Sequence, residues 1–157
     1  MNKLIRWSWV YTLVGLSVSA MLFSFSAITG AHSVQVYLDN KLEIDHYVDS
    51  KMQAPSLLLD PAKNYREVIV KYSECGRTVT GRTITIKDAN DKVMKEWRFE
   101  GASSGFKDPM VCQVKDITAL KQKGSNTVKL YYSSNEFPEG QQIASLVLGG
   151  EATTALK

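Results

Sequence analysis

Histidine and cysteine are scarce in this sequence, which has two of each among 157 residues. A zinc site normally takes three or four ligands of these types, so the composition argues against one. A Ser-His-Asp arrangement would have to use His46, because His32 lies at the end of the apolar leader described next. We expect His46 to be an ordinary strand residue, and we predict no catalytic residues, no metal site and no cofactor.

Charged residues are absent from residues 7–31, an apolar stretch that follows Lys3 and Arg6. A short basic region, an apolar run and small residues at its end are typical of a secretory signal peptide. Residues 29–31 place cleavage after Ala31, and Ser24 and Ser26 offer an earlier site. The alternative is a retained anchor, since 25 uncharged residues are long enough to span a membrane. Either way we expect export to the periplasm or the medium, with membrane contact only if residues 7–31 are kept.

The remaining chain is divided into a domain at residues 32–150 and a frayed tail at 151–157. The whole chain carries a net charge of +3, and the two cations of the leader leave +1 for residues 32–157. A nearly neutral domain lacks the basic surface of a nucleic-acid binder. We therefore predict no nucleic-acid partner.

Both cysteines, Cys75 and Cys112, lie in the exported part. A pair of cysteines in an oxidising compartment predicts a disulfide, which in a loop of this length contributes about 3–4 kcal/mol. The alternative is two buried free thiols.

Short runs of alternating apolar and polar residues predict about eight β-strands. The expected strands cover residues 33–39, 42–48, 66–73, 78–87, 92–99, 110–115, 126–133 and 142–148. Turns are expected at 39–40 and 88–91, and one helical turn is expected after an Asp116 N-cap, ending at Gly124. No crossover helices separate the strands, so the fold class is an all-β antiparallel sandwich or jelly roll, preceded by an N-terminal signal helix.

Residues 114–133 read VKDITALKQKGSNTVKLYYS. This stretch resembles the strand–turn–strand pattern of galactose-binding-like jelly rolls, and the matching positions are Asp116, Leu120, Gly124, Asn126 and Val128. The resemblance implies a jelly roll of the kind used as sugar-binding modules and as accessory domains of secreted glycosidases. The rest of the chain resembles small secreted bacterial domains.

No pair of carboxylates stands out among the 16 acidic residues. The acidic run at 88–91 is better explained as a hairpin turn than as a calcium loop, and a structural calcium ion there is the alternative. Several aromatic residues are candidate ligand contacts: Tyr37, Tyr47, Trp97, Phe106 and Tyr131. Trp97 and Phe99 share a parity with Val93, which is typical of a core face. Tyr131 is the best outward candidate, because Thr127 and Lys129 share its face. We expect a non-catalytic exported domain that binds a protein or another envelope component or has a structural role; the alternative is a carbohydrate-binding jelly roll.

Overall fold

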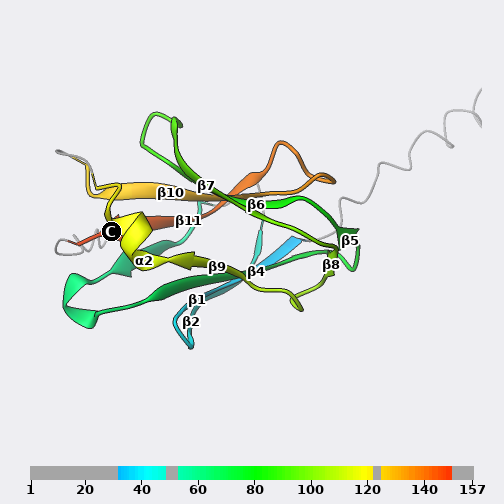
Figure 1. The fold of residues 1–157 in the computed structure, drawn as a ribbon, viewed down its shortest axis with the longest axis horizontal. Coiled ribbons are helices and arrows are strands. Elements are labelled where there is room, and N and C mark those ends of the chain that lie inside the picture. Colours follow the sequence, from blue (N-terminus) through cyan, green and yellow to red (C-terminus); the bar gives the residue numbers. More distant parts are fainter. Residues whose placement is uncertain (1–31, 49–52, 122–124, 150–157) are drawn as a thin grey trace, which may run out of the picture. The chain divides into compact units, whose positions relative to one another are not determined.

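The computed structural model describes residues 32–48, 53–121 and 125–149 (Figure 1). The predicted signal helix at 1–31, Gly124 and the tail at 151–157 lie outside the described residues. Within the described ranges, no helix combines the length and the hydropathy that a membrane span requires.

The described residues form eleven strands, one short α-helix and one 3₁₀ turn. The two helical elements are η1 (Pro61–Lys63) and α2 (Val114–Thr118). The strands are β1 (His32–Leu38), β2 (Lys41–Val48), β3 (Ser56–Leu59), β4 (Glu67–Glu74), β5 (Thr78–Val79), β6 (Arg82–Lys87), β7 (Val93–Phe99), β8 (Ser103–Ser104), β9 (Met110–Gln113), β10 (Thr127–Ser133) and β11 (Gln141–Leu148).

Two sheets hold most of these strands. Sheet A has the order β2-β1-β4-β9, and sheet B has the order β3-β11-β10-β6-β7. They form two layers in Figure 1, and β5 and β8 pair separately at one end. Side chains from both sheets share one buried core, which confirms the all-β prediction. All strand pairs are antiparallel except β3 with β11, which is parallel.

The first hairpin confirms the predicted turn and reveals a bulge. Residues 39–40 connect β1 to β2, and the Asp39 side chain accepts hydrogen bonds from the backbone N–H groups of Arg66 and Glu67. The register shifts between Val36 and Tyr37, so that Tyr37 faces Leu42. Leu42 has the same parity as the buried Ile44, and the bulge nevertheless turns Leu42 outward.

The second hairpin, β6–β7, also has a turn held by an aspartate side chain and a register shift. The Asp88 carboxylate accepts hydrogen bonds from the backbone of Asn90 and Lys92, which confirms the turn at 88–91. A register shift after Ile86 leaves Val93 52% exposed, against the predicted parity. Trp97 and Phe99 do pack against the core, as predicted.

The helix begins earlier than predicted. Its N-cap is Gln113, and Asp116 lies inside the first turn rather than capping it. Val114 and Ile117 are both buried by this turn, so apolar burial rather than an acidic cap sets its start. Between β7 and β9, residues 103–104 form strand β8, which pairs with β5.

The predicted disulfide is wrong, because both cysteines are free thiols. Cys112 is buried on β9 opposite Val68 of β4, whereas Cys75 is exposed just beyond the end of β4. Seven residues separate Val68 from Cys75, which is about 23 Å along an extended strand. A disulfide requires Cα atoms within about 7 Å of each other.

Candidate functional site

Four apolar side chains form a continuous row across the outer face of sheet A. Tyr37 on β1 faces Leu42 on β2 and Ile69 on β4, and Ile69 faces Val111 on β9. Directly opposed residues on one sheet face have Cβ atoms about 4.5–5.5 Å apart, so the four side chains are neighbours. We call Leu42, Tyr37, Ile69 and Val111 the apolar row.

The apolar row is accessible at both ends. Leu42 is 43% exposed and Val111 is 36% exposed, while Tyr37 and Ile69 between them are half-buried. Among the described residues, four large apolar side chains are exposed, and three of them lie on this face: Leu42, Val111 and the 72% exposed Tyr47. Exposed apolar surface gathered on one face is typical of an interaction site.

Polar groups on one side of the row fix the ring of Tyr37. Its hydroxyl donates a hydrogen bond to Gln35 Oε1 at 2.9 Å, and Gln35 Nε2 donates to Asp45 Oδ2 at 3.1 Å. The Lys71 Nζ atom lies 4.9 Å from the centre of the Tyr37 ring. The ring is therefore held in place before any partner arrives, which lowers the entropy cost of covering it.

A second polar group flanks the row on its other side. Gln113 Nε2 donates a hydrogen bond to Glu67 Oε1 at 3.2 Å, across β9 and β4. Glu67 and Lys71 lie two residues on either side of Ile69 along β4. On β4 the row therefore has a carboxylate on one flank and an ammonium group on the other, and Asp45 of β2 lies on the ammonium side.

Tyr131 lies on the outer face of sheet B, opposite Thr85 and Gln142. Its ring is covered on one side by Lys87, whose Nζ atom is 3.9 Å from the ring centre. The Tyr131 hydroxyl and Lys129 Nζ both donate to Asp91 Oδ1, at 3.4 and 2.8 Å. The hydrogen bond from Lys129 lowers the pKa of Asp91, whereas burial and then the charge of Asp91 raise the pKa of Tyr131.

Tyr131 also lines a hollow of about 670 Å³. The other polar side chains around it include Lys129, Gln142 and Ser145. Amide, hydroxyl and ammonium groups beside an aromatic ring are the groups that orient a polar ligand. We call this space the Tyr131 hollow.

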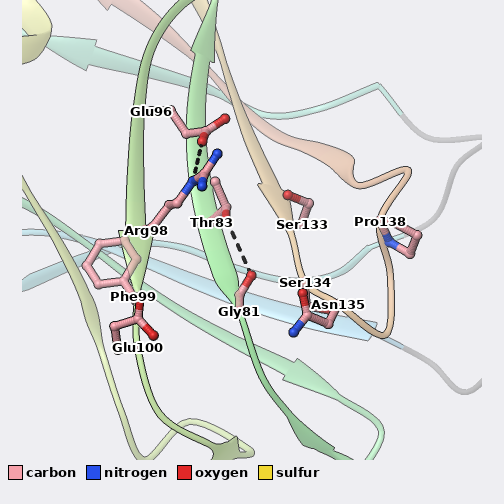
Figure 2. A pocket seen from close by; sticks show the side chains of 10 residues that line it. All are labelled: Gly81, Thr83, Glu96, Arg98, Phe99, Glu100, Ser133, Ser134, Asn135 and Pro138. Atoms are coloured by element: carbon pink, nitrogen blue, oxygen red, sulfur yellow. Dashed lines mark hydrogen bonds and ion pairs between the residues drawn. The ribbon is translucent and has the colours of Figure 1, made fainter.

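A second hollow of about 420 Å³ is lined by residues of β6, of β7 and of the loop at residues 134–140. Figure 2 shows Arg98 and Thr83 on one side of it, with Asn135 and Pro138 on the other. Arg98 Nε donates to Glu96 Oε1 at 2.7 Å, so the two charges at the rim are paired. Gly81 has a φ of +57°, which favours glycine, and a Cβ atom there would lie 2.5 Å from Oδ1 of the Asn135 side chain, which would have to move.

A buried polar cluster joins the two sheets. Glu74 on β4 is 4% exposed, and its Oε1 atom accepts hydrogen bonds from Tyr132 at 2.9 Å and Ser134 at 2.7 Å. Tyr132 stacks on Tyr72, with ring centres 3.8 Å apart, and the Tyr72 hydroxyl is 2.9 Å from His32 Nδ1. Burial, followed by the charge of Glu74, raises the pKa of both tyrosines. These groups are satisfied by one another, so we assign the cluster a structural role.

Sequence reasoning missed one motif. Residues 101–105 read G-A-S-S-G and match the letters of the G-x-S-x-G nucleophile elbow. In that elbow the serine lies on a sharp turn between a strand and a helix, with its Oγ exposed. Here Ser103 belongs to the two-residue strand β8 and is 3% exposed. The match is therefore in letters and not in geometry.

Other candidate ligands are separated in the fold. Within the described part of the chain, no three His, Cys, Asp or Glu side chains converge on a point where they could hold a metal ion. His46 lies within β2 opposite Val34, as expected for a strand residue, and it is half-buried.

The aromatic candidates divide between the two surfaces and the core. Tyr37 and Tyr131 lie on the outer faces of sheets A and B, and Trp97 packs inward. Sequence reasoning missed Ile69 and Val111, the apolar residues beside Tyr37. The available signal was that each occupies the outward position between two buried neighbours, since Val68, Val70, Met110 and Cys112 are all buried.

No protein-family model matches this chain, and no curated protein matches it. The resemblance of residues 114–133 to galactose-binding-like domains therefore remains a prediction. In this stretch Val128 is buried and Leu120 packs against the core, but Asp116 does not cap the helix.

Proposed function

We propose that this chain is an exported, non-catalytic domain that binds a protein of the cell envelope through the outer face of sheet A. The observation that carries the proposal is the apolar row, which crosses all four strands and has exposed side chains at both ends. Each square ångström of apolar surface removed from water stabilises a complex by about 25 cal/mol, so covering this face favours association.

The arrangement of the polar groups supports a binding role over a catalytic one. The buried carboxylate of Glu74 is directed at Tyr132 and Ser134, and the hydroxyl of Ser103 is buried. At the rim of the second hollow, Glu96 is paired with Arg98. A general base has to reach the proton that it removes, and these groups are engaged or enclosed.

Site-specific photo-crosslinking in the producing cell tests the proposed face. A benzophenone amino acid at Ile69 should give an adduct with another polypeptide, whereas the same group at Ser133, on the outer face of sheet B, should not. Adducts at Ser133 alone would contradict the proposal. N-terminal sequencing of the same material tests export, because a start at His32 supports cleavage and an intact Met1 supports the anchored form.

The Tyr131 hollow favours a second candidate, a carbohydrate-binding jelly roll. Its support is the aromatic ring beside Gln142 and Ser145, together with the resemblance of residues 114–133. A glycan array with the exported protein tests it. Binding that is lost in Tyr131→Ala, and kept in Tyr47→Ala, would support this candidate; silence across the array would contradict it.

A further inference from the structure

Strand β4 carries a symmetric pattern of charge on the outer face of sheet A. Ile69 lies in the apolar row, with Glu67 two residues before it and Lys71 two residues after it. Residues two apart on a strand lie on the same face, about 6.6 Å from each other along the chain. The carboxylate and the ammonium group therefore flank the row at equal distances and on opposite sides.

We infer that the partner of this face is a second copy of the same chain. The inference rests on the proposed role of the outer face of sheet A and names its occupant. A twofold axis that runs along the apolar row would place the same surface of each copy against the other, as isologous dimers require.

This symmetry makes the charges complementary. Rotation about the row reverses the strand direction, so Lys71 of each copy lies against Glu67 of the other, and two ion pairs form. The same rotation places Ile69 against Ile69 and Tyr37 against Tyr37. Aromatic pairs of this kind contribute about 0.5–1.5 kcal/mol beyond the area that they bury.

Charge and size set the expected strength of the dimer. Residues 32–157 have a net charge of +1, the chain's +3 less the two cations of the leader, so two copies repel each other weakly. Four strands spaced about 4.8 Å apart give a face about 19 Å wide, which is small for a stable interface. We therefore expect a dissociation constant on the order of tens of micromolar.

Sedimentation equilibrium of the exported protein, from about 1 to about 500 µM, brackets this range. Wild type should show a monomer–dimer equilibrium. Ile69→Lys should raise the dissociation constant at least about 50-fold, and Val111→Lys, at a more exposed position, should act in the same direction if Ile69→Lys folds poorly. Ser133→Lys on sheet B is the matched control and should leave the constant unchanged.

Charge reversal tests the symmetry itself. Glu67→Lys and Lys71→Glu should each weaken the dimer on the order of tenfold, because each places like charges together twice. The double variant Glu67→Lys/Lys71→Glu should return to within about threefold of wild type, because both ion pairs are restored with reversed sign.

Two results would overturn the inference: a wild type that stays monomeric throughout, or a dimer that tolerates Ile69→Lys but is lost in Ser133→Lys. A monomeric wild type that still gives adducts with a different protein from position 69 would remove the second copy and leave the proposed function standing. Absence of both dimer and adducts would remove both.

Discussion

The outer faces of the two sheets cover the same core but differ in how their side chains are engaged. Charged groups form exposed pairs on both sheets, as Arg98–Glu96 and Lys129–Asp91 do on sheet B and Lys41–Glu43 does on β2 of sheet A. On sheet A the apolar row lies between polar flanks, and two of its side chains remain exposed. Covering exposed ion pairs stabilises a complex little, whereas covering an apolar row stabilises it by removing apolar surface from water. This difference supports the proposal that sheet A is the face of association.

The largest expected effect on stability comes from removing the buried carboxylate that links the two sheets. Glu74→Ala removes the carboxylate that bonds Tyr132 and Ser134 across the sheets, and leaves both hydroxyls buried without this acceptor. We expect it to lower the free energy of unfolding by about 3 kcal/mol. Denaturant unfolding measures this, and Glu96→Ala on the outer face of sheet B is the control, with an expected change within about 0.5 kcal/mol. Equal losses in the two variants would contradict the assigned role of the cluster.

The loss of stability at high pH should depend on the buried tyrosines Tyr72 and Tyr132 and hardly on the outer Tyr131. The pKa values of Tyr72 and Tyr132 are raised by burial and by the charge of Glu74. The stability that this represents is fully present below the ordinary tyrosine pKa of about 10 and is lost as pH rises above it, by up to about 1.4 kcal/mol per group per pH unit.

Unfolding measured between pH 9 and pH 12 checks this, with the pH limits set by the tyrosine pKa of about 10. Tyr132→Phe should reduce the slope. Tyr131→Phe, which changes the outer face of sheet B, should leave the slope nearly unchanged, because solvent screens that group. A slope that follows Tyr131 would contradict the comparison.

The buried thiol of Cys112 and the exposed thiol of Cys75 should differ in their rates of alkylation. Burial raises the pKa of Cys112 to about 12, whereas Cys75 is exposed. Alkylation of the native protein should modify Cys75 at least about 100-fold faster than Cys112, because only the thiolate reacts. Mass spectrometry without reductant gives the rates, and a native protein in which neither cysteine reacts until reductant is added would restore the disulfide.

The smallest effect is expected on the outer face of sheet B. Lys129→Ala removes the exposed hydrogen bond to Asp91. We expect Tm to change by less than about 2 °C, since exposed ion pairs contribute little. Thermal unfolding measures this, and a shift above about 5 °C would show that the pairs on sheet B are more than surface contacts.

Local alternation predicted much of the fold. It placed Tyr131 on an outer face and Trp97 and Phe99 toward the core, because a strand turns successive side chains to opposite faces. It failed at Val93, where a bulge in the ladder changes the parity, and a similar bulge separates Leu42 from the parity of Ile44. Bulges depend on pairing between strands, which one strand's residues do not specify.

The candidate site was harder to predict than the fold. Ile69 and Val111 are far apart in the sequence, and only the order β1-β4-β9 brings them beside Tyr37. The cysteine pair failed for a related reason, because the prediction needed the distance along β4 as well as the compartment. Each of these features depends on strand order, and composition does not contain strand order.

The claim that two copies of the chain associate through sheet A is tested most directly by backbone NMR spectra of the protein at low and high concentration. We expect concentration-dependent shifts at Tyr37, Ile69 and Val111, with Tyr131, Ser133 and Gln142 unchanged. Shifts confined to the residues of sheet B, or no shifts at all, would contradict it.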